Sequence, residues 1–292
     1  MRDAVRRADP IVLAVFLATV LAGGSNFVAV RFSNRELAPL WGAAIRIAAS
    51  GVLLLALALA ARVPLPRGRA LAAALGFGVW NFGLGYALTY LGLVDAPAAV
   101  AASVVATVPL LTLLMAAANG IERITARRIV GGCVAVAGIG LIFVDQLRLA
   151  VPAGALAAVI GLALVISSSN VIAKRMPEAH PIATNAVAMP IGSLVLFLLA
   201  VATAERLAAP TRVEVWTAVV YLVFSTIVLF VGFFFVVRRW AASATAYATV
   251  LTPVVTVVLG AILAGESVSL AFLAGAAFVL AGTYVGALAP AA

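Results

Sequence analysis

Nine polar or charged residues stand out within the apolar stretches of this 292-residue chain. Buried amide, hydroxyl and guanidinium groups need hydrogen-bond partners, which either neighbouring helices or a bound solute can supply. They do not form an ordered set of nucleophile, base and orienting group, so they indicate binding and not catalysis. The nine candidate binding residues are Asn26, Arg46, Asn81, Tyr86, Ser103, Thr107, Asn170, Asn185 and Tyr247.

Two of these asparagines, Asn26 and Asn170, lie 144 residues apart, near the ends of two apolar runs. One interpretation is a symmetric pair of polar groups at a cavity or gate. The other is a pair of interhelical hydrogen bonds, typically worth about 0.6 kcal/mol and at most near 2 in membranes. Both interpretations stay open at this stage.

The residues around Asn81 suggest a surface for planar solutes. Asn81 lies deep in an apolar run, followed by Tyr86, whose counterpart 144 residues later is Phe230. Two aromatic side chains at equivalent positions can form a wall that stacks on a planar group.

A proline follows two hydroxyl residues in the fourth apolar run. Ser103 and Thr107 share a helix face just before Pro109, and Tyr247 is the counterpart of Ser103. A proline frees a backbone carbonyl that nearby hydroxyls can satisfy. The segment is either a kinked helix facing a ligand or a kink used only for packing.

Arg46 is the one basic residue that falls inside an apolar run. It lies six residues in, roughly 9 Å along a helix axis. Its side chain can snorkel to the membrane surface, or offer a fixed positive charge to a carboxylate. Its counterpart is Pro190, so this charge is not repeated in the second half.

The composition requires a membrane environment. Hydrophobic residues make up 65% of the chain and charged residues 10%, against roughly 45–50% and about 25% in soluble domains. The apolar runs do not alternate with polar residues as barrel strands do, so they are helical. We expect ten spans of about 20 residues, near 11–30, 40–61, 70–90, 97–118, 129–144, 153–173, 182–203, 214–236, 244–264 and 270–289.

Charge distribution orients the chain. The formal net charge is +9, but the basic residues are scattered over short loops and form no stripe for nucleic acid. With a cytoplasmic N-terminus, 13 of the nineteen basic residues face the cytoplasm, five face outward and one lies within a span. The positive-inside rule therefore predicts that both termini are cytoplasmic.

Few residues are available for cofactor chemistry. The single Cys133 excludes an internal disulfide, and one histidine makes a cluster of soft metal ligands implausible. No nucleotide-binding glycine loop is present. The ten acidic residues lie in tails or at span ends, so a proton relay would have to use a group such as Glu36 or Asp95. We expect no cofactor and no metal.

The chain repeats itself at a constant distance of 144 residues, and Glu122 pairs with Glu266 as Asn26 pairs with Asn170. Because each copy holds five spans, equivalent helices run in opposite directions across the membrane. We therefore predict an all-α membrane protein with ten transmembrane helices in two inverted five-helix repeats, residues 1–148 and 149–292. An inverted repeat makes alternating access natural because the halves can exchange conformations.

These motifs resemble the ten-helix EamA branch of the drug/metabolite transporter superfamily over nearly the whole chain. The resemblance is carried by residues 24–31 (GSNFVAVR), Arg46, Val108-Pro109, residues 122–125 (ERIT), the following glycines, and the second-copy motifs at residues 169–175, 252–253, 266–269, 275 and 282. It departs at residues 21–24, where a tryptophan often precedes the glycine, and at the serines 167–169, where glycine is common. Both departures make the substrate harder to infer.

The resemblance implies a secondary transporter. Most members of this branch are bacterial exporters of amino acids, related metabolites or drugs, and aromatic amino-acid exporters are among them. We expect export of amino acids, including aromatic ones, across the bacterial inner membrane. The expected partners are a small-molecule substrate and the lipid bilayer, without nucleic acid, in a monomer or weak homodimer. Multidrug or nucleobase efflux and a non-transporting scaffold are the alternatives.

Overall fold

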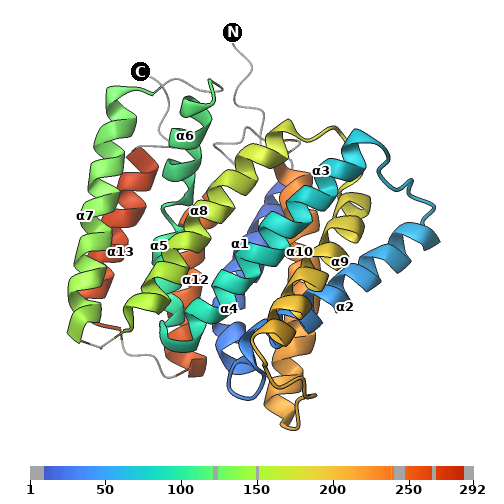
Figure 1. Ribbon diagram of the computed structural model, residues 1–292. Helices are drawn as coiled ribbons and strands as arrows, with labels where there is room; N and C mark the ends of the chain where they lie inside the picture. The colour runs from blue at the N-terminus through green and yellow to red at the C-terminus, as the bar shows by residue number, and fades with distance from the viewer. Residues whose placement is uncertain are drawn as a thin grey trace.

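The computed structural model describes residues 10–120, 124–148, 151–237, 239, 247–264 and 268–285, and its regular elements in these ranges are all helical (Figure 1). The α-helices are α1 (Pro10–Ser33), α2 (Pro39–Ala60), α3 (Arg69–Phe77), α4 (Tyr86–Asp95), α5 (Ala98–Val105), α6 (Val108–Ala118), α7 (Ala126–Arg148), α8 (Ala153–Arg175), α9 (Pro181–Ala202), α10 (Val213–Val237), α12 (Tyr247–Ala264) and α13 (Leu270–Thr283). A π-helix, η1 (Gly78–Gly85), joins α3 to α4.

These helices have the length and composition that a bilayer demands. Within the described ranges, seven continuous helical segments are long and apolar enough to cross a membrane, and apolar parts of α7 and α13 are shorter. Large apolar side chains such as Val213, Ile262 and Leu270 are strongly exposed on the outer faces. Since lipid can solvate these side chains, the expected membrane-embedded all-α architecture is confirmed.

Two predicted spans are interrupted. The third combines α3, η1 and α4 into one rod, and its middle turn is π-helical instead of continuously α-helical. The fourth breaks between α5 and α6, with Pro109 in the first turn of α6. The hydroxyl of Thr107 donates to the carbonyl of Val104 at 2.6 Å at this break, one residue before the Val105 carbonyl that Pro109 deprives of its helical donor.

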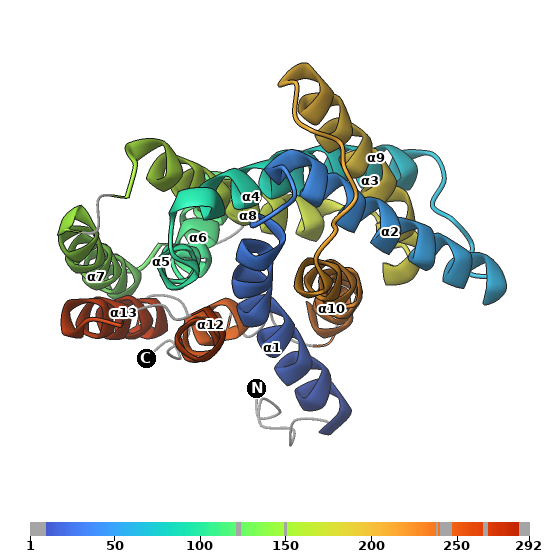
Figure 2. The same ribbon diagram turned by 90° about the horizontal axis from the view of Figure 1, so that it is seen from below.

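The helices pack with the symmetry of an inverted repeat. Helix α1 contacts α10 and α12, and its counterpart α8 contacts η1, α4, α5 and α6. The counterparts α2 and α9 pack on each other, as do α7 and α13. Figures 1 and 2 show the α7–α13 pair at one edge and the α2–α9 pair at the opposite edge, with α1, α8, α4 and α10 between them.

Glycines mark the symmetric contact between α7 and α13. A Cβ on Gly138 would lie 2.6 Å from the Gly275 carbonyl oxygen, and one on Gly282 would lie 2.5 Å from that of Gly131. These glycines therefore form the packing seam expected from their spacing. The repeat residues Glu122 and Glu266 lie outside the described residues, and the domain division after residue 148 stays a prediction.

Candidate substrate cavity

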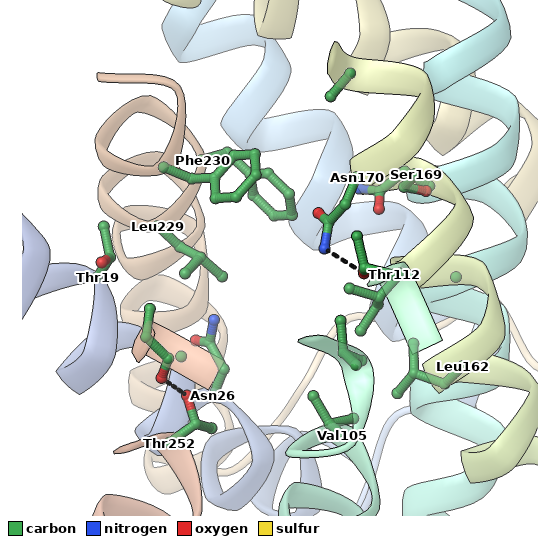
Figure 3. Close-up of a pocket in the computed structure, with 18 of the residues that line it drawn as sticks. Thr19, Asn26, Val105, Thr112, Leu162, Ser169, Asn170, Leu229, Phe230 and Thr252 are labelled. Atoms are coloured by element: carbon green, nitrogen blue, oxygen red, sulfur yellow. Dashed lines mark hydrogen bonds between the residues drawn. The ribbon is translucent and has the colours of Figure 1, made fainter. Parts of the chain in front are cut away.

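A cavity of about 600 Å³ lies between α1, α10 and α12 on one side and η1, α4, α6 and α8 on the other (Figure 3). This volume is within the range of small-molecule sites, roughly 300–1,000 Å³. Most of its lining is apolar, and its polar members include Thr19, Asn26, Arg46, Asn81, Tyr86, Thr89, Thr112, Ser169, Asn170 and Thr252.

The cavity reaches the surface at one end of the helix bundle. Its lining extends to Lys174 and Glu178, which are exposed at the end of α8 and in the turn after it. We call this end the Lys174 end; it also holds the start of α1, and both lie at the top of Figure 1. The opposite end, with the α1–α2 and α9–α10 turns, is the Glu36 end, and its turns contribute no lining residue among those described.

Arg46 points into the protein interior. It is only 2% exposed, its Nε donates to the hydroxyl of Thr226 at 2.7 Å, and its guanidinium carbon lies 5.0 Å from the centre of the Tyr86 ring. Within the described ranges, no carboxylate forms an ion pair with this guanidinium. The side chain therefore does not snorkel, and its charge is directed towards the cavity that it lines.

The aromatic wall is present. Tyr86 and Phe230 both line the cavity, with ring centres 6.3 Å apart, and Phe82 lies behind them at 4.7 Å from Phe230. The wide π-turn of η1 makes residues five apart neighbours on one face. Asn81 and Tyr86, five residues apart, accordingly line the same cavity.

The two repeat-related polar pairs differ. The hydroxyl of Ser225 donates to Oδ1 of Asn26 at 2.6 Å. The equivalent pair is Asn81 with Asn170, but Asn170 donates instead to the hydroxyl of Thr112 at 3.3 Å (Figure 3), and Nδ2 of Asn81 has no partner. The halves of the molecule therefore hold equivalent residues in different arrangements.

Three of the nine predicted residues do not line this cavity. Ser103 is completely buried without a partner for its hydroxyl, and Thr107 bonds the backbone of its own segment. Asn185 donates from Nδ2 to the carbonyl of Pro181 at 3.0 Å. These side chains face helix packing, and a binding role for them remains a prediction without geometric support. The side chain of Tyr247 lies outside the described residues.

Sequence reasoning missed several hydroxyls in the lining. One of them is Ser169, which directly precedes the predicted residue Asn170. Its side chain is 2% exposed, and its Oγ has no hydrogen-bond partner. Thr112 and Thr252 also contribute to the wall. Threonine in a membrane helix can bond its own i−4 carbonyl, as Thr252 does to Ala248 at 2.8 Å, so the residue type alone does not distinguish packing from lining.

Carboxylates close the Glu36 end. Glu36, in the α1–α2 turn, accepts from the backbone N–H of Thr211 at 2.8 Å and of Arg212 at 3.1 Å, and from the Thr211 hydroxyl. Glu205, in the α9–α10 turn, accepts from the first free N–H groups of α2, those of Leu40 and Trp41. Each carboxylate therefore caps a helix of the other repeat, where the helix dipole favours negative charge.

Hydrogen bonding changes the acidity of Glu36. The Thr211 hydroxyl above all, together with the N–H groups of Thr211 and Arg212, lowers the pKa of the Glu36 carboxyl below its ordinary 4.5 against a smaller opposing effect of burial. Glu36 is therefore ionised at neutral pH. That state suits a structural cap and not a proton carrier.

The sequence comparison identifies the family. The model of the EamA-like transporter family matches residues 10–144 and again 153–287. The chain belongs to the EamA-like transporter family. This EamA-like protein is a multi-pass membrane transporter and not an enzyme.

Relatives of similar length support this assignment. An uncharacterized transporter of Archaeoglobus fulgidus is 27% identical over 284 residues, covering 94% of this chain and 97% of the relative. The uncharacterized inner membrane transporter YedA of Escherichia coli K12 is 31% identical over 269 residues, covering 90% of this chain and 86% of YedA. A solved crystal structure shares the fold with a TM-score of 0.70 at 19% identity, covering 96% of this chain and 98% of the other.

Proposed function

We propose that this transporter exports small metabolites across the inner membrane by alternating access, with amino acids, including aromatic ones, as its leading substrates. The observation that carries the substrate class is the cavity itself, which places the buried Arg46 cation beside the aromatic pair Tyr86 and Phe230. A carboxylate and a planar side chain are the groups that such a lining complements.

The cavity opens at the end from which an exporter would load its solute. With both termini in the cytoplasm, as the basic residues predict, the Lys174 end faces the cytoplasm and the cavity is open to it. Glu36 and Glu205 then close the outer end. A cavity loaded from the cytoplasm and closed to the outside is the inward-facing state of an exporter. YedA, named as an inner membrane transporter, supports the same membrane for this chain.

The two unequal polar pairs support alternating access. In an inverted repeat, each half in one state resembles the other half in the opposite state. The Asn26–Ser225 hydrogen bond joins α1 to α10, while the equivalent Asn170–Asn81 bond between α8 and η1 is absent. The outward-facing state would form the second bond and break the first.

Drug or nucleobase efflux is the second candidate, because most of the lining is apolar and a planar uncharged solute also stacks on Tyr86 and Phe230. A scaffold role predicts that cavity substitutions leave function unchanged.

The test is counterflow of radiolabelled amino acids into liposomes that contain the purified protein, first without an ion gradient. We expect saturable uptake that decreases in Tyr86→Ala and Asn81→Ala. Lack of flux for every amino acid, with or without a proton gradient, would contradict the substrate class and favour the efflux alternative.

A further inference from the structure

We infer that the cavity recognises the carboxylate of its solute through Arg46 and Asn81, and that it does not require an ammonium group. The inference rests on the proposed function insofar as this cavity is the transport site. It extends the substrate class from amino acids to monocarboxylates that carry a planar apolar group and no amine.

The first step is the charge of Arg46. The guanidinium is buried, and within the described part of the chain its neighbours are the hydroxyl of Thr226, the ring of Tyr86 and the hydroxyl group of Tyr90, all without negative charge. A buried cation that lacks a counter-charge is unfavourable, and an anionic ligand relieves that penalty. The planar guanidinium retains two nitrogen atoms beyond the bonded Nε, in the geometry that suits a carboxylate.

The second step is the free donor of Asn81. This residue is 7% exposed, lines the same cavity, and its Nδ2 has no hydrogen-bond partner. A buried amide nitrogen without an acceptor is rare unless a ligand or water completes it. Nδ2 is a donor, as are the guanidinium nitrogens, so both groups seek the same kind of ligand atom, an oxygen acceptor.

The third step is the shortage of matching negative charge. Among the described lining residues, the acidic one is Glu178, which is exposed at the mouth, in the turn after α8. The ammonium group of an amino acid therefore meets amide and hydroxyl oxygens or aromatic faces, and no fixed carboxylate deep in the cavity. The fixed charge deep in the cavity, that of Arg46, therefore favours the carboxylate of the solute over its ammonium group.

The test uses three solutes with one phenylethyl skeleton. L-Phenylalanine carries carboxylate and ammonium groups, 3-phenylpropionate only the carboxylate, and 2-phenylethylamine only the ammonium. Binding to the full-length protein in detergent at pH 7.5 is measured by isothermal titration calorimetry. Each solute is also tested as a competitor of phenylalanine counterflow in liposomes. We expect phenylalanine and 3-phenylpropionate to bind and compete, and 2-phenylethylamine to do neither.

The variants assign the effect to the two donors. Arg46→Gln should weaken binding of both carboxylates about tenfold or more, the loss expected for a charged hydrogen bond. Asn81→Asp, which preserves shape, should do the same by placing a second negative charge beside the bound carboxylate, and it remains informative if Arg46→Gln does not fold. Arg67→Gln removes an exposed positive charge in the α2–α3 connection, outside the cavity lining, and should leave the preference among the three solutes intact.

The outcomes separate the two proposals. If 2-phenylethylamine binds as well as 3-phenylpropionate, or if Arg46→Gln and Asn81→Asp bind carboxylates normally, the inference is wrong even where phenylalanine transport stands. Binding of phenylalanine without 3-phenylpropionate also overturns it, because an ammonium group would then be required. If none of the three binds, the inference fails and phenylalanine is not a substrate, whereas the amino-acid class as a whole is decided by the counterflow test with the other amino acids.

Discussion

Phe230 illustrates how a single residue can set specificity in this cavity. Its ring packs against Phe82 and lies beside Tyr86, and it lines the space that a solute would occupy. Aromatic pairs contribute about 0.5–1.5 kcal/mol beyond the apolar area that they bury. The contribution applies only to a solute that presents a planar group, whereas Arg46 acts on any carboxylate.

We therefore predict that Phe230→Ala raises the counterflow KM for phenylalanine about twofold to tenfold and leaves that for valine nearly unchanged, since only the aromatic solute loses a stacking partner. Phe278→Ala, which alters an exposed ring on α13, is the matched control. An equal rise in KM for both solutes would indicate a general loss of structure and contradict the assignment of a stacking role.

Close packing of α7 on α13 depends on particular glycines and not on glycine in general. Gly138 lies against the backbone of α13, whereas Gly140, on the same helix, has no atom within 4 Å of the place where a Cβ would be. We predict that Gly138→Ala destabilises the protein by about 1–3 kcal/mol through overpacking. Gly140→Ala should be neutral or slightly stabilising because alanine favours the helix.

Thermal unfolding of the two variants in detergent measures this difference. Equal melting temperatures for Gly138→Ala and Gly140→Ala would show that the α7–α13 seam tolerates a methyl group and would contradict the close contact.

The Glu36 cap makes this end of the molecule pH-sensitive. Because the folded state lowers the Glu36 pKa below 4.5, its stabilising effect is fully present above the unfolded value and is lost as pH falls through the lower folded value. We predict that Glu36→Gln lowers the melting temperature at pH 7, and that the difference from the parent protein shrinks as pH falls through the folded pKa.

Glu214→Gln is the control for this prediction, since Glu214 is exposed in the first turn of α10 at the same end. A constant difference between Glu36→Gln and the parent protein across the whole pH range would show that the carboxylate charge does not stabilise the cap.

The ends of the whole molecule are chemically unequal although its helices are symmetric. The repeat counterparts of Glu36 and Glu205 are His180 and Ala61, so the Lys174 end lacks equivalent carboxylates. The equivalent helices α9 and α3, both described at their N-termini, consequently have no side-chain cap there. This difference favours closure at the Glu36 end and a cavity open at the Lys174 end.

Loss of the Asn26–Ser225 bond should therefore shift the conformational equilibrium. We predict that Ser225→Ala closes the Lys174 end more often, whereas Asn81→Ala, which removes the partner needed in the opposite state, opens it more often. A cysteine at Ala173, in the cavity lining, reports the change through its rate of labelling by a maleimide, in a background where the exposed Cys133 is serine. Equal rates in the two variants would contradict the exchange of pairs.

The sequence by itself determined the membrane environment, the ten spans, the inverted repeat and much of the polar lining. Apolar composition leaves lipid as the only adequate solvent. Motifs that recur at a constant spacing of 144 residues, such as Asn26 and Asn170, reveal the duplication. Asn26, Arg46, Asn81, Tyr86 and Asn170 were identifiable because polar groups in an apolar helix need partners.

Only the tertiary structure decided which partners these are. Helical periodicity predicts which face of its own helix carries Ser103 or Arg46. It does not predict which neighbouring helix packs against that face. Packing turns Ser103 into the core and Arg46 towards Thr226 and the cavity, and it brings Thr112 beside Asn170. The choice of open end likewise depends on contacts between residues about 165 to 176 positions apart, which no local pattern encodes.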